Sequence, residues 1–208
     1  MRPITREIVQ KVMSELEDTS DLIHDVFTPV PALVVGRLLG SSEADIPNLI
    51  RWAGAINGLY EKGGLIDPQK AIHAEEMLNE IRSFVTRLAD DRRAIRDQDE
   101  LDSTKDVLAG LINSETAGDS LSESELVSTV VTLFVAGHET TTHLLGNGLL
   151  ALLNSDSEMQ KIKSQPDRIP NAIDEMARFD GSVPRSWRIT KRDMEISGVM
   201  IPEGQLVL

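Results

Sequence analysis

The sequence predicts a mainly α protein with a short β segment at its carboxyl end. Aromatic residues make up only 3% of the 208 residues, and Leu, Ile, Ala and Glu recur at helical spacing through most of the chain. From Ser186 onward this spacing gives way to short β-like stretches separated by turn residues. A chain of this length can bury roughly 70% of its unfolded surface, so a stable core needs neither disulfides nor a structural metal.

Proline and glycine divide the first half of the chain into helices. We expect one from Pro31 to Leu39, because proline suits a first helical turn and Gly40 suits the position just past the end. A second is expected from Pro47 to Tyr60, followed by a glycine-containing break. A third, long and amphipathic, should start at Asp67-Pro68 and run to about Arg96.

Four arginines gather near the end of that third helix, at positions 87, 92, 93 and 96. Cations at a helix C-terminus complement the helix dipole, which is the simpler interpretation. A docking patch for an acidic partner is the alternative.

The most informative helix is expected from Ser122 to about Asn154. Ser122 and Glu125 have the spacing of a capping box, and the helix would be roughly 50 Å long at 1.5 Å per residue. Its first half, Val127 to Ala136, is largely apolar and should therefore be buried.

A polar stretch, Ala136 to His143, interrupts this helix. Glycine and three consecutive threonines are poor helix formers, and Thr140 and Thr141 can bond the carbonyls four residues back. We therefore expect the helix to open locally. An opening beside Gly137 would leave a flat surface and a pocket for a planar ligand or a small molecule.

The two histidines of this stretch do not form a metal site by spacing. A zinc protease needs His-Glu-x-x-His, and Thr142 stands where the second histidine belongs. His138 and His143 lie about 140° apart around a regular helix, so they cannot chelate one ion. We expect them to be partly exposed or hydrogen-bonded instead.

Glu175 and Arg178 lie on one face of a short helix expected from Pro170 to Phe179. On its own this spacing indicates no more than a solvated ion pair. The extended segment from Val183 to Arg188 presents two arginines, which could clamp a carboxylate or belong to an ordinary surface loop.

Charge and composition exclude several classes of function. The net charge is −13 and neither half of the chain is basic, so nucleic-acid or membrane-surface binding has little support. The longest apolar run, Leu149 to Leu153, is far shorter than the roughly 20 residues that span a bilayer. No signal peptide follows Met1, so a cytoplasmic location is expected. The chain contains no Cys and cannot supply a thiolate ligand.

The motifs resemble the cytochrome P450 superfamily in their order and spacing. They are the Ala-Gly-His-Glu-Thr-Thr stretch, the Glu-x-x-Arg helix, the Pro-x-x-x-Arg segment and the turn from Ile201 to Gly204. The stretch from Thr28 to Gly40 is similar to the soluble bacterial branch. The resemblance covers nearly all of the chain and implies a partial P450 fold whose long central helix crosses the distal face of a haem b.

The resemblance also implies roles on that helix. Glu139 and Thr140 match the catalytic acid–alcohol pair, which delivers protons in order for cleavage of the oxygen–oxygen bond. Ala136 and Gly137 match the residues that border the haem. Simple back-bonding within the helix is the alternative role for Thr140.

Further roles are implied nearer the carboxyl end. Glu175 and Arg178 match a buried ion pair that fixes the haem-proximal core, and Arg188 matches a ligand to a haem propionate. The break from Tyr60 to Ile66 would belong to a mobile lid. Three residues match the segment that lines the substrate pocket: Val183, Pro184 and Trp187.

The resemblance implies that residues 1–208 are a partial haem-thiolate monooxygenase domain. The N-terminal part and the C-terminal loop with the cysteine ligand of the iron would lie outside it. The parent enzyme would insert one oxygen atom into a small or medium apolar substrate, with electrons from a ferredoxin or flavoprotein reductase. We expect the isolated chain to be inactive without the thiolate. The alternative is a short helical ligand-binding or interaction protein without redox chemistry.

Overall fold

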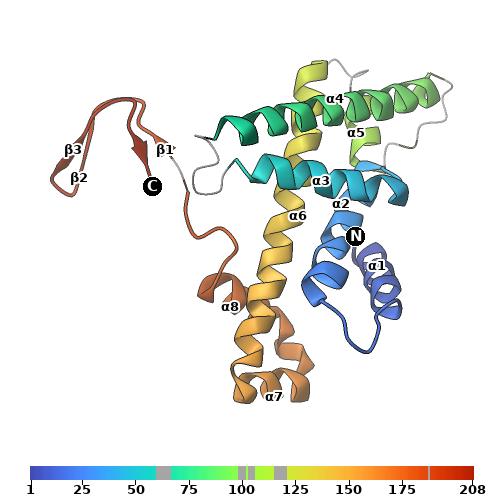
Figure 1. Ribbon diagram of the computed structural model, residues 1–208, viewed down its shortest axis with the longest axis vertical. Helices are drawn as coiled ribbons and strands as arrows, with labels where there is room; N and C mark the ends of the chain where they lie inside the picture. The colour runs from blue at the N-terminus through green and yellow to red at the C-terminus, as the bar shows by residue number, and fades with distance from the viewer. Residues whose placement is uncertain (60–66, 98–101, 103–105, 115–120, 187) are drawn as a thin grey trace. The chain divides into compact units, whose positions relative to one another are not determined.

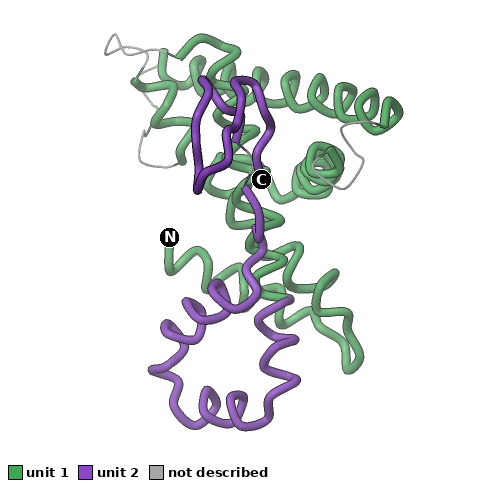
Figure 2. Tube along the Cα trace, turned by 90° about the vertical axis from the view of Figure 1, so that its left-hand side faces the viewer, with its two compact units in different colours: residues 1–146 green, residues 147–208 purple. Residues whose placement is uncertain are grey.

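The computed structural model describes residues 1–59, 67–97, 102, 106–114, 121–186 and 188–208, and it is mainly α as predicted (Figure 1). The α-helices are α1 (Arg2–Ser14), α2 (Pro29–Leu39), α3 (Ile46–Asn57), α4 (Pro68–Arg96), α5 (Val107–Ser114), α6 (Glu123–Leu153), α7 (Asp156–Ser164) and α8 (Ile169–Phe179). Short helical turns are η1 (Ile23–Phe27, a π-helix), η2 (Glu43–Asp45) and η5 (Pro166–Arg168). The chain divides into two compact units, residues 1–146 and 147–208 (Figure 2).

The first unit has its main core between α2, α3, α4, α5 and the first part of α6. Leu108 and Ile112 of α5 and Val85 of α4 are its largest fully buried side chains. The rings of Trp52 and Phe84 pack with centroids 5.3 Å apart and so join α3 to α4. A smaller apolar cluster, Val12, Val26 and Val30, ties α1 to η1 and α2.

The predicted end of α2 is confirmed. Gly40 has φ +75°, the left-handed conformation that favours glycine after a helix. A Cβ at Gly40 would also collide with the side chains of Arg92 and Asp106. The turn therefore needs glycine both for its backbone conformation and for the space that the ion pair occupies.

The arginines at the end of α4 have partners within the first unit. Arg92 donates to the carbonyl of Gly40 at 2.9 Å and pairs with Asp106 at 3.1 Å. Arg96 donates to the carbonyl of Ile112 at 3.2 Å. These contacts tie α4 to α2 and α5, so the structural role, and not the docking patch, accounts for Arg92 and Arg96.

Helix α6 begins as predicted. The amide of Ser122 donates to Glu125 Oε2 at 2.8 Å, and the amide of Glu125 donates to Ser122 Oγ at 3.3 Å, which is the capping box. The predicted local opening is wrong, because the helix is regular from Glu123 to Leu153. The predicted full burial of its first half is also wrong. Phe134 is buried but Leu133 is 42% exposed, so one face of α6 lies open.

Six helical elements were not predicted: α1, η1, η2, α5, α7 and η5. Pro3 in the first turn of α1 and Ser155 before α7 are weak start signals of the expected kind. Helix α5 is short and wholly apolar at its buried positions, so its periodicity alone does not distinguish a helix from a strand.

The second unit contains the end of α6, then α7, η5 and α8, and two short antiparallel ladders. Strands β2 (Met194–Ile196) and β3 (Val199–Ile201) form the predicted hairpin, with Ser197 and Gly198 at φ 53° and 81°. Positive φ at both turn residues is typical of a type I′ turn. Strand β1 (Arg188–Ile189) pairs with β4 (Leu206–Val207), and within the described ranges no helix is long and apolar enough to cross a bilayer.

Candidate functional site

The polar stretch of α6 presents two different faces within the first unit. His138 and Thr142 lie one turn apart and are buried, with 2% and 5% of their surface exposed. Ala136 and Thr140 lie on the opposite side of the helix, about 160° and 200° around from His138. Ala136 is exposed and Thr140 is partly exposed. We call the first side the back face and the second the front face.

Thr140 bonds the preceding turn of its own helix. Its Oγ1 donates to the carbonyl of Ala136 at 2.6 Å, and Thr141 Oγ1 donates to Gly137 O at 3.2 Å, as the sequence predicted. Since a hydroxyl has one proton and two lone pairs, Thr140 Oγ1 keeps its acceptor capacity. Back-bonding is therefore compatible with a further role for this oxygen.

Glu139 lies beside α3. Its Oε1 is 4.0 Å from the position that a Cβ on Gly54 would take. A methyl group at Gly54 would therefore be in ordinary van der Waals contact with the carboxylate. Glu139 is half-buried and so stands between the protein interior and solvent.

Gly137 packs against α2. A Cβ at this position would lie 2.8 Å from Val35 Cγ2, closer than side chains approach in folded proteins. Glycine is needed here for the close approach of α2 and α6. The structure thus gives Gly137 a packing role that the sequence did not predict, and its place beside a haem stays a prediction.

His138 is the buried polar residue that the sequence analysis left without a function. Its Nε2 lies 3.2 Å from the carbonyl of Thr28, and its ring stacks on Phe134 with centroids 5.6 Å apart. Burial lowers the pKa of His138, which outweighs the opposite effect of the Thr28 carbonyl, and nearby His143 lowers it further. Its Nδ1 has no hydrogen-bond partner within the described part of the chain. The ring is therefore neutral, with its proton on Nε2.

The front face of α6 suits a flat apolar ligand. Leu133, Ala136 and the methyl group of Thr140 offer no charge, and Thr140 directs its proton into the helix. A planar macrocycle can lie against such a surface without stranding a charged group. The residues present therefore fit the distal side of a haem.

The residues predicted for the ion pair come together in the second unit. Arg178 Nε and Nη2 donate to the two carboxylate oxygens of Glu175 at 2.7 and 2.6 Å, a bidentate pair that lowers the pKa of Glu175. The side chains of Arg178 and Glu175 are 71% and 58% exposed. The resemblance implied a buried pair, but within the described residues of this unit nothing covers that face of α8.

Glu175 also borders a groove of the second unit. This groove has a volume of about 1020 Å³ and lies between the end of α6, α7 and α8. Apolar side chains such as Leu152, Ile162, Met176 and Phe179 line it. The groove is open to solvent in the second unit and is mainly apolar.

The remaining predicted residues belong to the strand segment of the second unit. Arg188 begins β1 and donates to Ser186 Oγ. Val183 and Pro184 are exposed. Trp187 lies outside the described residues. The assignment of Val183, Pro184 and Trp187 to a substrate pocket therefore stays a prediction.

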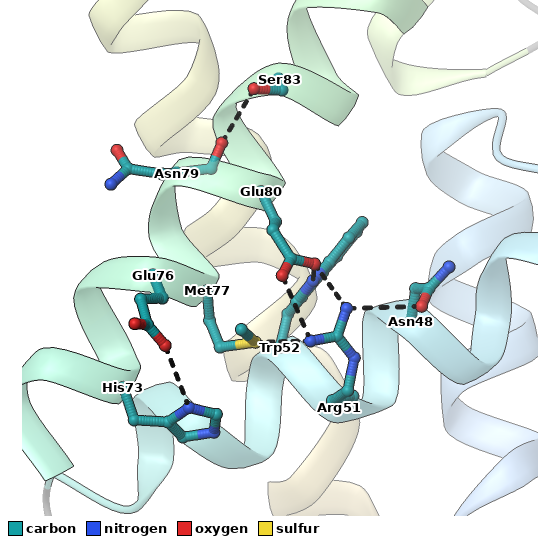
Figure 3. Close-up of polar contacts among 9 residues, drawn as sticks. All are labelled: Asn48, Arg51, Trp52, His73, Glu76, Met77, Asn79, Glu80 and Ser83. Atoms are coloured by element: carbon teal, nitrogen blue, oxygen red, sulfur yellow. Dashed lines mark hydrogen bonds and ion pairs between the residues drawn. The ribbon is translucent and has the colours of Figure 1, made fainter. Parts of the chain in front are cut away.

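Sequence analysis missed a polar cluster that joins α3 to α4 (Figure 3). Arg51 Nη2 and Trp52 Nε1 both donate to Glu80 Oε2, at 2.5 and 2.8 Å. Arg51 also donates to Met77 Sδ at 2.8 Å. The hydrogen bonds from Arg51 and Trp52 lower the pKa of Glu80. No local sequence signal marks these contacts, since they join residues on different helices.

Comparisons with known proteins agree with the resemblance. The family model for cytochrome P450 matches residues 65–169. The chain is 30% identical to cytochrome P450 CYP107DY1 of Priestia megaterium, over 100% of this chain and 48% of that protein. It is 30% identical to vitamin D(3) 25-hydroxylase of Pseudonocardia autotrophica, over 100% of this chain and 49% of that protein.

A solved structure is similar to this chain in fold. It is the cytochrome P450 enzyme CxnD for C–S bond formation in chuangxinmycin biosynthesis, with a TM-score of 0.84 and 30% identity. The match covers 99% of this chain and 48% of that one. The chain thus spans about half the length of the curated relatives and the solved structure that it matches.

Proposed function

The chain belongs to the cytochrome P450 family, and we propose that it forms the central part of a haem-thiolate monooxygenase. The proposed reaction inserts one oxygen atom of dioxygen into a small or medium apolar substrate. The observation that carries the proposal is the front face of α6, where Thr140 Oγ1 is held over an exposed, uncharged surface at Ala136.

Haem b fits this face but needs a ligand from elsewhere. When bound, the haem supplies the activation of dioxygen at its iron. Ala136 and Thr140 would lie against its distal side, and Arg188 would pair with a propionate. The 208 residues contain no Cys, so the thiolate ligand would come from polypeptide outside them.

Thr140 would hold a proton donor at the site of oxygen chemistry. Its own proton is committed to the carbonyl of Ala136, so its lone pairs face outward as acceptors. A water molecule bonded to Oγ1 would then have a fixed position. Ordered delivery of a proton from this position favours oxygen insertion over release of peroxide.

Glu139 would supply a new proton to the water molecule bonded to Thr140 Oγ1. Its carboxylate lies half-buried beside Gly54 and can exchange protons with solvent. A carboxylate one residue before Thr140 could pass a proton to the bound water through a second water molecule. We therefore assign the proton relay to Glu139 and Thr140.

The groove of the second unit would be covered by the rest of the family fold. The support is the coverage, since the matched relatives are about twice as long as this chain. Its apolar lining and the exposed Glu175–Arg178 pair would then both become buried. Burial would give the ion pair the core-fixing role that the resemblance implies.

The substrate pocket and the source of electrons are separate from the Glu139–Thr140 relay. Val183, Pro184 and Trp187 are proposed to line the substrate pocket, whose shape selects an apolar molecule. A ferredoxin or flavoprotein reductase is the proposed electron donor.

A chimera tests this proposal. Residues 1–208 would replace the matching segment of the Priestia megaterium relative, which would supply the remaining parts of the fold and the cysteine. We expect the chimera to bind haem and to give the reduced carbon monoxide spectrum of a thiolate-ligated iron. A chimera that folds, as judged by far-ultraviolet circular dichroism, but takes up no haem would contradict the proposal and favour a binding protein without redox chemistry.

A further inference from the structure

The back face of α6 holds two polar side chains that the proposed mechanism does not use. Phe134, His138 and Thr142 are spaced four residues apart and are all buried. The latter two bond the chain where η1 passes into α2, and the Thr142 hydroxyl also lies 3.2 Å from the carbonyl of His138 in its own helix. Thr142 Oγ1 donates to Phe27 O at 2.8 Å, and His138 Nε2 lies 3.2 Å from Thr28 O.

The carbonyl of Phe27 requires an outside donor because of the local sequence. In an α-helix it would accept from the amide four residues on, but that residue is Pro31, which has no N–H. The amide of Thr28 donates to the carbonyl of Ile23, which closes the π-turn but gives the Phe27 carbonyl no donor. Thr142 supplies the missing donor, and buried backbone carbonyls are costly to leave without one.

The same turn of α6 is intrinsically weak. Gly137 and the three consecutive threonines lower helix propensity, and threonine back-bonding tends to bend helices. The helix is nevertheless regular here. Contacts on the back face therefore supply the order that the local sequence does not.

These contacts also fix the rotation of the helix. Turning α6 by one residue, about 100°, would carry both donors away from the two carbonyls and force Gly137 away from Val35. Thr140 points to the side opposite His138. Its direction is thus set by bonds made on the far side of the helix.

We propose that His138 and Thr142 are positioning residues that set the rotation of α6 and so direct Thr140 toward the site of oxygen chemistry. The position of Thr140 in catalysis rests on the proposed function, whereas the rotation of α6 does not. Together with the apolar contacts of Phe134 and the first part of α6, these two residues outside the relay thereby help to place its hydroxyl.

The absence of Cys allows a direct measurement on the 208-residue chain without haem. Spin labels on Ala136→Cys in α6 and Ser83→Cys in α4, both in the first unit, report the distance between the two helices by pulsed electron resonance. A rotation of 100° displaces a group on a helix of about 5 to 6 Å radius by roughly 8 Å.

Four single substitutions in this labelled chain separate positioning from general stability. Thr142→Val and His138→Phe remove one donor each and keep the volume and the ring. We expect each variant to show a second population of distances, displaced from the first by up to roughly 8 Å. The ratio of the second population to the first should be about five-fold higher than in the parent chain. Thr141→Val removes only a bond within α6 and should leave the parent distribution. His138→Gln keeps a donor for Thr28 O and should restore it.

The outcomes decide between the alternatives. If Thr142→Val and His138→Phe leave the distance distribution unchanged, or Thr141→Val alters it equally, the two residues do not position α6. In the haem-loaded chimera, Thr142→Val should lower product formed per reductant about five-fold without changing KM. If Thr140→Ala has no effect there, the proposed function fails, while the distances still decide the positioning.

Discussion

Arg92 and Asp106 form an ion pair beneath the turn that ends α2. Their side chains are 17% and 3% exposed, and the bond between Arg92 Nη2 and Asp106 Oδ2 measures 3.1 Å. Asp106 Oδ1 also accepts from the amide of Ala109 at 2.7 Å, which caps α5. One carboxylate therefore links α4, α5 and the α2 turn.

Removing this carboxylate should destabilise the first unit strongly. Asp106→Ala leaves the Arg92 charge poorly compensated and uncaps α5, and we expect a loss of about 3 kcal/mol in the free energy of unfolding. Asp90→Ala is the control, because Asp90 is an exposed partner of Arg93 and should cost less than about 1 kcal/mol. Equal losses in the free energy of unfolding, measured by urea denaturation of the two variants, would show that the buried pair stabilises the first unit no more than the exposed pair does.

Alanine substitutions at Gly40 and Gly198 distinguish the cost of backbone strain from the cost of steric collision. Both glycines have positive φ, at 75° and 81°, but a Cβ at Gly198 meets nothing within 4 Å. Gly198→Ala should cost about 1 kcal/mol from the backbone alone, and Gly40→Ala clearly more, because it also displaces Arg92. Thermal unfolding of the two variants measures this, and an equal decrease in stability would rule out the collision.

The close approach of α2 and α6 can be tested by second-site rescue. Gly137→Ala should destabilise the chain by about 1 to 3 kcal/mol, because the new methyl group overlaps Val35. Val35→Ala should recover part of that loss in the double variant, although alone it destabilises through its cavity. Additive losses in a double-mutant cycle would argue against the contact.

The neutral His138 predicts a pH dependence of stability. Burial lowers its pKa from the ordinary value of 6.5, so below that pH the unfolded chain binds more protons than the folded one. The contribution of the neutral His138 ring to the free energy of unfolding is therefore complete above about pH 6.5, and it is lost as the pH falls toward the lowered pKa. His138→Gln should flatten this part of the profile of unfolding free energy against pH. A parent and variant with parallel profiles between pH 7 and 5 would contradict a buried neutral ring.

Local signals predicted the helix ends well and the long-range contacts poorly. Gly40, Asp67 and the Ser122–Glu125 box act within a few residues, so their spacing is sufficient evidence. The bond from His138 to Thr28 joins residues 110 positions apart, and no periodicity encodes it. The expected opening of α6 failed for this reason, because the contacts that keep the helix regular come from η1 and α2.

In the candidate site, too, local spacing could be predicted from the sequence and long-range contacts could not. The acid–alcohol spacing of Glu139 and Thr140 and the i,i+3 spacing of Glu175 and Arg178 can be identified from the sequence. The exposure of the second pair depends on which polypeptide covers α8, and spacing does not specify this. The packing of Gly137 under Val35 likewise depends on the tertiary fold.

Coupling of electron use to product in the haem-loaded chimera tests the central claim most directly. The measurement compares the parent chimera with Thr140→Ala, with Thr141→Ala as the neighbouring variant that also loses a back-bond. We predict that Thr140→Ala continues to consume reductant and dioxygen but releases peroxide in place of most of the product, while Thr141→Ala stays close to the parent. Unchanged coupling in Thr140→Ala would contradict the assignment of this hydroxyl to the proton relay.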